Sequence, residues 1–321
     1  MRALNEFLRT FKATYVVNNV LKRKALTHNQ ALYQQYGLKK SIYAPLSHAD
    51  FSELPTETPW LDQSNAWEQA QSHVDFATFS EEMQVGIKDW IEKGYLILRG
   101  YFDGENVKAI NEEVDHLLKK GIVDQHHNGK VFFAFRHSDL LKKVVWDRDL
   151  LRLMSFLLGR QMQPFQSLNF IQGSQQAAHS DSIHMTTHPL GNLTAIWIAL
   201  EHVGPDNGPL VYYPGSHRLP YIMNRDFDHG GSRWRVGDDA NGRYEAHIAK
   251  LIKEKELEAV EFHTEPGDLL IWHANLLHGG KAIQRKGATR KSMVVHYFAQ
   301  DVICYHELTQ RPALLPLVEY V

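Results

Sequence analysis

The feature that most constrains the fold of this chain is a series of short apolar and β-branched runs between Gln163 and Phe298. Residues of the turn-forming types Gly, Pro, Asn and Asp separate one run from the next. Short strands at even spacing, with turn residues between them, are typical of an antiparallel sandwich or barrel. We expect strands at 165–172, 193–200, 209–213, 260–263, 268–272 and 292–298.

Helical patterns precede this series. Ser80 followed by two glutamates predicts a helix start, and Gly94 stands where such a helix would end. A short strand is expected at 95–98, and further helices are expected at 105–120 and 150–158. Residues 219–258 interrupt the strands with a Gly-rich, charged first half and an expected helix at 244–257, which indicates an inserted flap. The sequence therefore predicts a mainly β fold with flanking helices.

Charge divides the chain into two parts. Residues 1–50 contain eight Lys or Arg and two acids, a net of +6, so the remainder carries −8 of the total of −2. Apolar residues at steps of three and four predict an amphipathic helix within 1–25, namely Leu4, Phe7, Leu8, Phe11 and Tyr15. The prolines in 54–62 indicate a linker. We therefore expect a basic arm and linker at 1–78 and one domain at 79–321.

The arm has two interpretations. A basic amphipathic segment can contact a membrane or another anionic surface through residues 1–25, and a solvated helix face is the commoner explanation of such a pattern. The acidic body and the lack of a nucleic-acid-binding motif argue against a nucleic-acid partner. The sequence gives no indication of oligomeric state.

Other classes of protein are excluded by simple features. The chain has no run of 18 apolar residues, so no transmembrane helix is expected. Residues 1–25 lack the apolar core of a signal peptide. Cys304 is the only cysteine, which excludes an internal disulfide and a cysteine-rich zinc site. A reducing, cytoplasmic setting fits this composition.

The pattern His-x-Asp supplies the first two ligands of many mononuclear iron sites, and it occurs four times in this chain. Context distinguishes His179-Ser-Asp181, because these residues follow an expected strand and a turn. One intervening residue places both side chains on the same side of an extended backbone. The acids of the other three occurrences, Asp50, Asp75 and Asp139, are interpreted as helix caps or surface acids.

A third ligand is expected from a distant strand. The segment GDLLIWHANLLHGG offers His273 and His278, which would face opposite sides of a single extended strand. Arg290 follows His278 by twelve residues and opens the run RKSMVVHYF. A guanidinium there can hold a carboxylate by two parallel hydrogen bonds, although a surface arginine is the usual explanation of one such residue. Two histidines and one carboxylate suit an iron(II) site with open positions.

From about Gly94 to Phe298 the sequence resembles the phytanoyl-CoA dioxygenase family of iron(II)/2-oxoglutarate oxygenases. The matching pieces are GYLILRGYF, HSD at 179–181, TAIWIALEHV, PDNGPLVYYPGSH, GDLLIWH with LLHGG, and TRKSMVVHYF. The resemblance implies a double-stranded β-helix, the jelly roll of cupin-like proteins. It also implies that His179, Asp181 and His278 are the metal ligands and that Arg290 binds 2-oxoglutarate.

The resemblance further implies a function. The protein would use Fe(II), 2-oxoglutarate and dioxygen to hydroxylate a small-molecule or a lipid- or sugar-linked metabolite, with 2-oxoglutarate decarboxylated to succinate. The alternative is a non-catalytic jelly-roll binding protein that keeps the fold, and the complete ligand set argues against it. Candidates for the rest of the cosubstrate pocket, each equally explained by ordinary sheet packing, are Gln166, Asn169, Gln176, Thr194 and Trp197. His184 and His188 follow the ligand loop and either contact substrate or form a polar rim.

Overall fold

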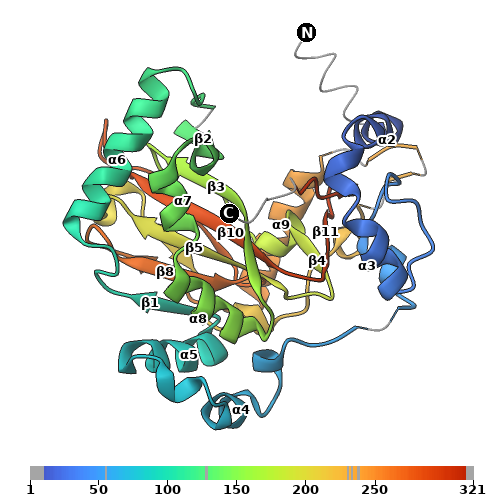
Figure 1. Ribbon diagram of the computed structural model, residues 1–321, viewed down its shortest axis with the longest axis horizontal. Helices are drawn as coiled ribbons and strands as arrows, with labels where there is room; N and C mark the ends of the chain where they lie inside the picture. The colour runs from blue at the N-terminus through green and yellow to red at the C-terminus, as the bar shows by residue number, and fades with distance from the viewer. Residues whose placement is uncertain are drawn as a thin grey trace.

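A six-stranded antiparallel sheet forms the centre of the computed structural model, which describes residues 11–54, 56–126, 129–229, 231–232, 234–236 and 239–315 (Figure 1). Its strands, in spatial order, are β1 (Tyr95–Leu98), β8 (Leu269–His273), β5 (Leu193–Ala199), β10 (Ser292–Ala299), β3 (Met162–Phe170) and β2 (Lys130–Phe132). Every pairing in this sheet is antiparallel. The antiparallel architecture predicted from the sequence is confirmed.

Two smaller antiparallel sheets accompany the large one. The first is ordered β12 (Arg311–Pro312), β11 (Ile303–His306) and β4 (Thr186–His188). The second is ordered β7 (Val260–Phe262), β6 (Leu210–Tyr212) and β9 (His278–Gly280). Several of these strands have only two to four residues, and the sequence did not predict β2, β4, β9, β11 or β12.

The two faces of the large sheet pack against different partners because successive side chains of a strand alternate. On β5, Ile196 and Ile198 belong to the apolar cluster that includes the helices. Ala195 and Trp197 belong instead to a cluster with Leu210 and other residues of the β7-β6-β9 sheet. The face with Ala195 and Trp197 is therefore the interior of a two-layered β structure, and the face with Ile196 and Ile198 is its exterior, which helices cover.

Five of the described helices contribute to the apolar cluster on the exterior face: α4 (Ala66–Ser72), α5 (Glu81–Lys93), α6 (Gly104–Lys119), α7 (Asp139–Val145) and α8 (Arg148–Leu158). The Ser80 side chain accepts a hydrogen bond from the Met83 backbone N–H, which caps α5 as expected. Gly94 and Gly159 end α5 and α8 in the left-handed conformation, with φ of 84° and 65°. The helices predicted at 105–120 and 150–158 are confirmed to within two residues.

The N-terminal part of the chain packs on the β12-β11-β4 sheet. Figure 1 shows α3 (Asn29–Gln35) beside β11, and the Arg311 guanidinium of β12 lies 5.0 Å from the Tyr15 ring centroid of α2 (Lys12–Leu21). Five buried residues of the N-terminal part form an apolar cluster with Ile303 and Tyr305 of β11. They are Leu26, Tyr33, Ile42, Leu46 and Phe51. Leu4, Phe7 and Leu8 of the predicted amphipathic helix lie outside the described residues. The division into 1–78 and 79–321 stays a prediction.

The inserted segment contributes helix α9 (Ala240–Glu254), which begins four residues before the predicted helix and ends three residues before its predicted end. Tyr244 and Ile248 of α9 are buried in a cluster with Ile183, Leu277 and Leu308. Ile183 lies just after Asp181, so this helix packs directly behind the candidate ligand loop. None of the described helices has the length and apolar content needed to cross a membrane.

Candidate metal centre

His179 and His278 lie side by side although they are 99 positions apart in the sequence. Their backbones form an antiparallel bridge with two hydrogen bonds of 2.9 Å, and their ring centroids are 4.5 Å apart. Gly279 makes this approach feasible, because a Cβ there would lie 2.8 Å from the Gln176 carbonyl oxygen. The close crossing of two chain segments therefore explains the glycine that follows His278.

Each of these imidazoles has one nitrogen engaged by the backbone. Nδ1 of His179 lies 2.9 Å from the Ala177 carbonyl oxygen, and Nδ1 of His278 lies 3.0 Å from that of Leu276. A carbonyl only accepts, so Nδ1 carries the hydrogen and Nε2 keeps its lone pair for a metal. Burial, and next the neighbouring His278, lowers the pKa of His179 to about 4, which keeps its imidazole neutral.

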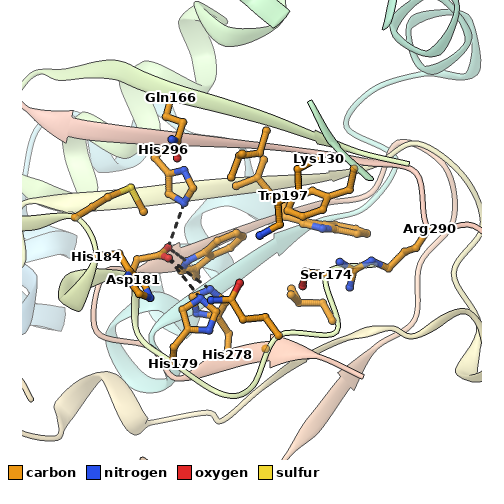
Figure 2. A pocket seen from close by; sticks show the side chains of 18 residues that line it. Lys130, Gln166, Ser174, His179, Asp181, His184, Trp197, His278, Arg290 and His296 are labelled. Atoms are coloured by element: carbon orange, nitrogen blue, oxygen red, sulfur yellow. Dashed lines mark hydrogen bonds and ion pairs between the residues drawn. The ribbon is translucent and has the colours of Figure 1, made fainter. Parts of the chain in front are cut away.

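Asp181 completes the group. Its Oδ1 lies 3.9 Å from Nε2 of His179 and 3.7 Å from Nε2 of His278 (Figure 2). One ligand atom from each of the three residues lies within 4.8 Å of the others, and all three side chains are buried. Neutral imidazole and carboxylate donors in this number fit an iron(II) ion with open positions. The predicted triad is therefore brought together by the fold.

The second oxygen of Asp181 has partners of its own. Oδ2 accepts a hydrogen bond of 2.7 Å from the Trp272 indole Nε1 and lies 3.5 Å from Nε2 of His296. Burial alone would raise the pKa of the Asp181 carboxyl. The attraction of the His278 and His296 imidazoles outweighs that effect and holds the pKa below its usual range. The carboxylate is therefore anionic throughout the neutral range.

Arg290 is a buried cation without a carboxylate partner. Its side chain is 1% exposed, and its terminal N–H donates to the Gly208 carbonyl at 3.1 Å. Among the described residues no acid lies within 4.0 Å of it, and its Nε has no hydrogen-bond partner. Burial lowers its pKa to about 10, so the group is still charged at neutral pH. Because an uncompensated buried charge is costly, this arrangement favours an anionic ligand at Arg290.

A cavity of about 250 Å³ joins Arg290 to the ligand triad. Figure 2 shows Lys130, Ser174 and Arg290 toward one end, with Gln166, His184 and His296 toward the other. The Lys130 ammonium and the Arg290 guanidinium both lie over the Phe170 ring, at 5.5 Å and 5.9 Å from its centroid. Burial, and next the nearby Arg290 charge, lowers the pKa of Lys130. Positive charge is thus concentrated at one end of the cavity.

The other predicted pocket residues divide into two groups. Gln176 and Trp197 line the cavity, and so does Gln166. Gln166 lies near His296 and away from Arg290, and its contact with the cosubstrate stays a prediction (Figure 2). Asn169 and Thr194 are not among the lining residues. Strand alternation explains this, because the lining residues of β3 are the even-numbered Gln166, Leu168 and Phe170 and that of β5 is Trp197.

His273 shows where the sequence argument was incomplete. His273 and His278 do not share one strand, because β8 ends at His273 and β9 begins at His278. His273 instead lies with its Nε2 3.2 Å from an Asp62 carboxylate oxygen. The structure supports His278 as the third ligand. His278 differs from His273 because a turn separates them, and not because the two lie on opposite faces of one strand. His188 is buried and stacks on Phe51 at 4.3 Å, whereas His184 lines the cavity.

Three cavity residues that contact Asp181 or lie near Arg290 were not predicted from the sequence: Lys130, Trp272 and His296. The sequence pattern could have identified Trp272 and His296. Each lies two residues after an inward-facing residue, Leu270 or Val294, in a strand that was predicted, so its side chain also faces inward. Lys130 stands in a strand of three residues, which is too short to show a period. The acids of the remaining His-x-Asp patterns behave as expected; Asp50, for example, accepts a hydrogen bond from the Ser47 backbone N–H as part of a capping box.

Comparisons with known proteins agree with this geometry. The family model for phytanoyl-CoA dioxygenase (PhyH) matches residues 90–292. The mouse phytanoyl-CoA dioxygenase domain-containing protein 1 is 29% identical over 164 residues, 51% of each chain. The rat peroxisomal phytanoyl-CoA dioxygenase is 28% identical over 130 residues, 40% of this chain and 35% of that protein. The chain thus spans about half the length, or less, of the curated relatives it matches.

Solved structures show the same fold. EctD from S. alaskensis, determined with 2-oxoglutarate and 5-hydroxyectoine, matches with a TM-score of 0.57 at 18% identity, covering 81% of this chain and 92% of that one. The 2-oxoglutarate-dependent carbocyclase SnoK from nogalamycin biosynthesis matches with the same TM-score and identity, covering 72% and 88%. The jelly-roll architecture predicted from the sequence is confirmed.

Proposed function

This chain belongs to the phytanoyl-CoA dioxygenase family, and from that membership we propose that it is an iron(II)/2-oxoglutarate-dependent dioxygenase. His179, Asp181 and His278 would hold the iron, and Arg290 with Lys130 would bind the far carboxylate of 2-oxoglutarate. The observation that carries the proposal is the buried Arg290, which has no carboxylate partner among the described residues and lines the cavity that contains the triad.

The residues of the chain have separate tasks in this reaction. When bound, iron and 2-oxoglutarate supply dioxygen activation, with 2-oxoglutarate converted to succinate and carbon dioxide. Backbone carbonyls orient both imidazoles through Nδ1, which leaves each Nε2 directed toward the metal position. Arg290 fixes the orientation of the keto acid. The buried walls of the cavity limit access of water to the reacting groups.

The substrate that fits this proposal is a small molecule or a lipid- or sugar-linked metabolite. Away from Arg290 and Lys130, the cavity is lined by amide, imidazole and thioether groups from Gln166, His184, Met185 and His296. Such groups suit a substrate that presents hydroxyl or other uncharged polar groups beside the reacting carbon. The EctD structure was determined with 5-hydroxyectoine, a small hydroxylated molecule, which supports the same class.

A succinate-formation screen tests the proposal. The protein, supplied with iron(II) and 2-oxoglutarate, is incubated with a metabolite library under labelled dioxygen. We expect succinate and a product containing one labelled oxygen atom, because Asp181 provides the carboxylate ligand that iron halogenases lack. Asp181→Ala should abolish both, whereas Arg285→Ala, at an exposed position, should change neither. Binding of 2-oxoglutarate without succinate for any compound would favour the non-catalytic binding protein instead.

The contact of residues 1–25 with a membrane or another anionic surface is also a proposal. Its support is that Val17, Val20 and Leu21 are 60%, 48% and 79% exposed on α2, directly before the exposed basic residues Lys22, Arg23 and Lys24. Flotation with vesicles that contain or lack anionic lipid tests the membrane contact, and the absence of flotation with both would refute it. A cytoplasmic setting and the absence of a nucleic-acid partner stay predictions.

A further inference from the structure

The two oxygens of Asp181 have different surroundings. Oδ1 faces the Nε2 atoms of His179 and His278, at 3.9 Å and 3.7 Å. Oδ2 accepts a hydrogen bond of 2.7 Å from the Trp272 indole N–H and lies 3.5 Å from Nε2 of His296, which stands on the side of Asp181 opposite His179 and His278 in Figure 2. Asp181 is only 4% exposed, so water cannot freely replace Trp272 and His296 as partners of Oδ2.

This asymmetry matters because a carboxylate can bind a metal through one oxygen or through both. Two-oxygen binding by Asp181 would use a position that a keto acid and dioxygen need. A hydrogen bond from an N–H to a carboxylate is charge-assisted and about twice as strong as a neutral one. An N–H aimed at Oδ2 therefore opposes rotation of that oxygen toward the metal.

The indole is well fixed for such a role. Trp272 is 2% exposed and belongs to strand β8, where it pairs with Tyr95 on β1 and Ala195 on β5. Its ring also lies 4.9 Å from the His278 ring, measured between centroids. The same residue thus contacts two of the three ligands from a rigid position in the large sheet.

We propose that Trp272 is a positioning residue that holds Asp181 as a one-oxygen ligand, with His296 as a weaker second contact on Oδ2. This inference rests on the proposed metal site. It assigns to the indole N–H a task beyond core packing, and the two roles can be separated because phenylalanine retains an aromatic ring but has no N–H.

The test uses metal binding by the full chain without 2-oxoglutarate. Co(II) is titrated into metal-free protein with a competing chelator, and its visible absorption reports the coordination. Outer-shell partners of ligands typically contribute about 10–100-fold to metal affinity. We expect Trp272→Phe to weaken Co(II) binding by a factor in this range, about 10–100, and to change the absorption spectrum.

Trp60→Phe is the matched control. The Trp60 indole also donates a 2.7 Å hydrogen bond, to the Phe156 carbonyl, and Trp60 does not line the cavity. This variant should lose stability but retain the affinity and the spectrum of the unmodified protein. Equal affinity and spectrum for Trp272→Phe and the unmodified protein would overturn the inference.

A second variant covers the case in which Trp272→Phe does not fold. Replacement of Trp272 by β-(3-benzothienyl)alanine keeps the bicyclic shape and exchanges the N–H for sulfur. It should show the same loss of affinity and the same spectral change, and unchanged binding would again overturn the inference. If the unmodified protein itself binds no metal at this site, the proposed function fails, which is a distinguishable result.

Discussion

At the residue scale, the metal site depends on which histidine presents a free Nε2 to Asp181. His278 does so, whereas His273 has its Nε2 3.2 Å from Asp62 and its Nδ1 accepting from the Asn275 backbone N–H. We expect His278→Ala to lose metal binding and turnover and to remain folded. His273→Ala should retain a bound metal and lose stability, because the Asp62 carboxylate, with its side chain 20% exposed, loses the His273 contact at 3.2 Å. Metal content after purification decides between them, and the reverse pattern would transfer the ligand role to His273.

Arg290 gives a second prediction at this scale. Truncation of one partner of a buried, hydrogen-bonded charge pair costs on the order of 2–5 kcal/mol. Arg290→Ala should therefore weaken binding of 2-oxoglutarate to the metal-loaded, oxygen-free protein by at least about 30-fold. Arg285→Ala is the control, since that side chain is exposed. If Arg290→Ala binds 2-oxoglutarate as the unmodified protein does, another cation holds the far carboxylate.

At the scale of elements, the sequence was sufficient wherever a strand was long enough to show its period. The runs at 193–200 and 292–298 gave the strands β5 and β10 almost to the residue, and their alternation correctly indicates which side chains face inward. Strands of three residues show no period, so the sequence predicted some of them, β6 and β7, and missed others, β9 and the β2 strand that carries Lys130. Short strands are stabilised by partners distant in sequence, which a local pattern does not contain.

Three parts of the chain meet at Glu307: the basic arm, the inserted segment 219–258, and the connection between β11 and β12 that contains Glu307 itself. Its carboxylate accepts hydrogen bonds from the backbone N–H groups of His48 in the arm, at 2.7 Å, and Asn224 in the insert, at 3.3 Å. Burial raises the pKa of Glu307 from 4.5 to about 7, and the two hydrogen bonds oppose that effect. The folded protein therefore binds a proton between about pH 4.5 and 7 that the unfolded chain has released.

It follows that this group makes the protein less stable as the pH rises through that range, by up to about 3 kcal/mol. Glu307→Gln cannot titrate, so its free energy of unfolding should lack this component. The measurement is chemical unfolding of both proteins at several pH values from 5 to 8. The stability of Glu307→Gln relative to the unmodified protein should increase with pH, and a constant difference would contradict the prediction.

At the scale of the whole molecule, composition and charge suggested a separate basic arm, but they could not show what the arm packs against. Its apolar residues cover β11, and the partners involved are more than 250 positions apart in the sequence. Phe51 is 4% exposed, stacks on His188 of β4 at 4.3 Å and lies 5.3 Å from Tyr305 of β11. Strand β4 directly follows the loop that carries His179 and Asp181. The arm thus supports the sheet next to the metal centre.

Phe51→Ala tests whether the arm is an integral part of the fold. Loss of a buried phenylalanine side chain typically costs about 3–5 kcal/mol, because transfer free energy is lost and a cavity remains. Val74→Ala is the control, since Val74 is 81% exposed and a surface substitution of this kind changes stability by about 0.5 kcal/mol or less. Urea unfolding followed by tryptophan fluorescence gives both values. A single transition with the full loss means that arm and sheet unfold together. A loss as small as that of the control would mean that residues 1–78 form the separable unit that the charge pattern predicts.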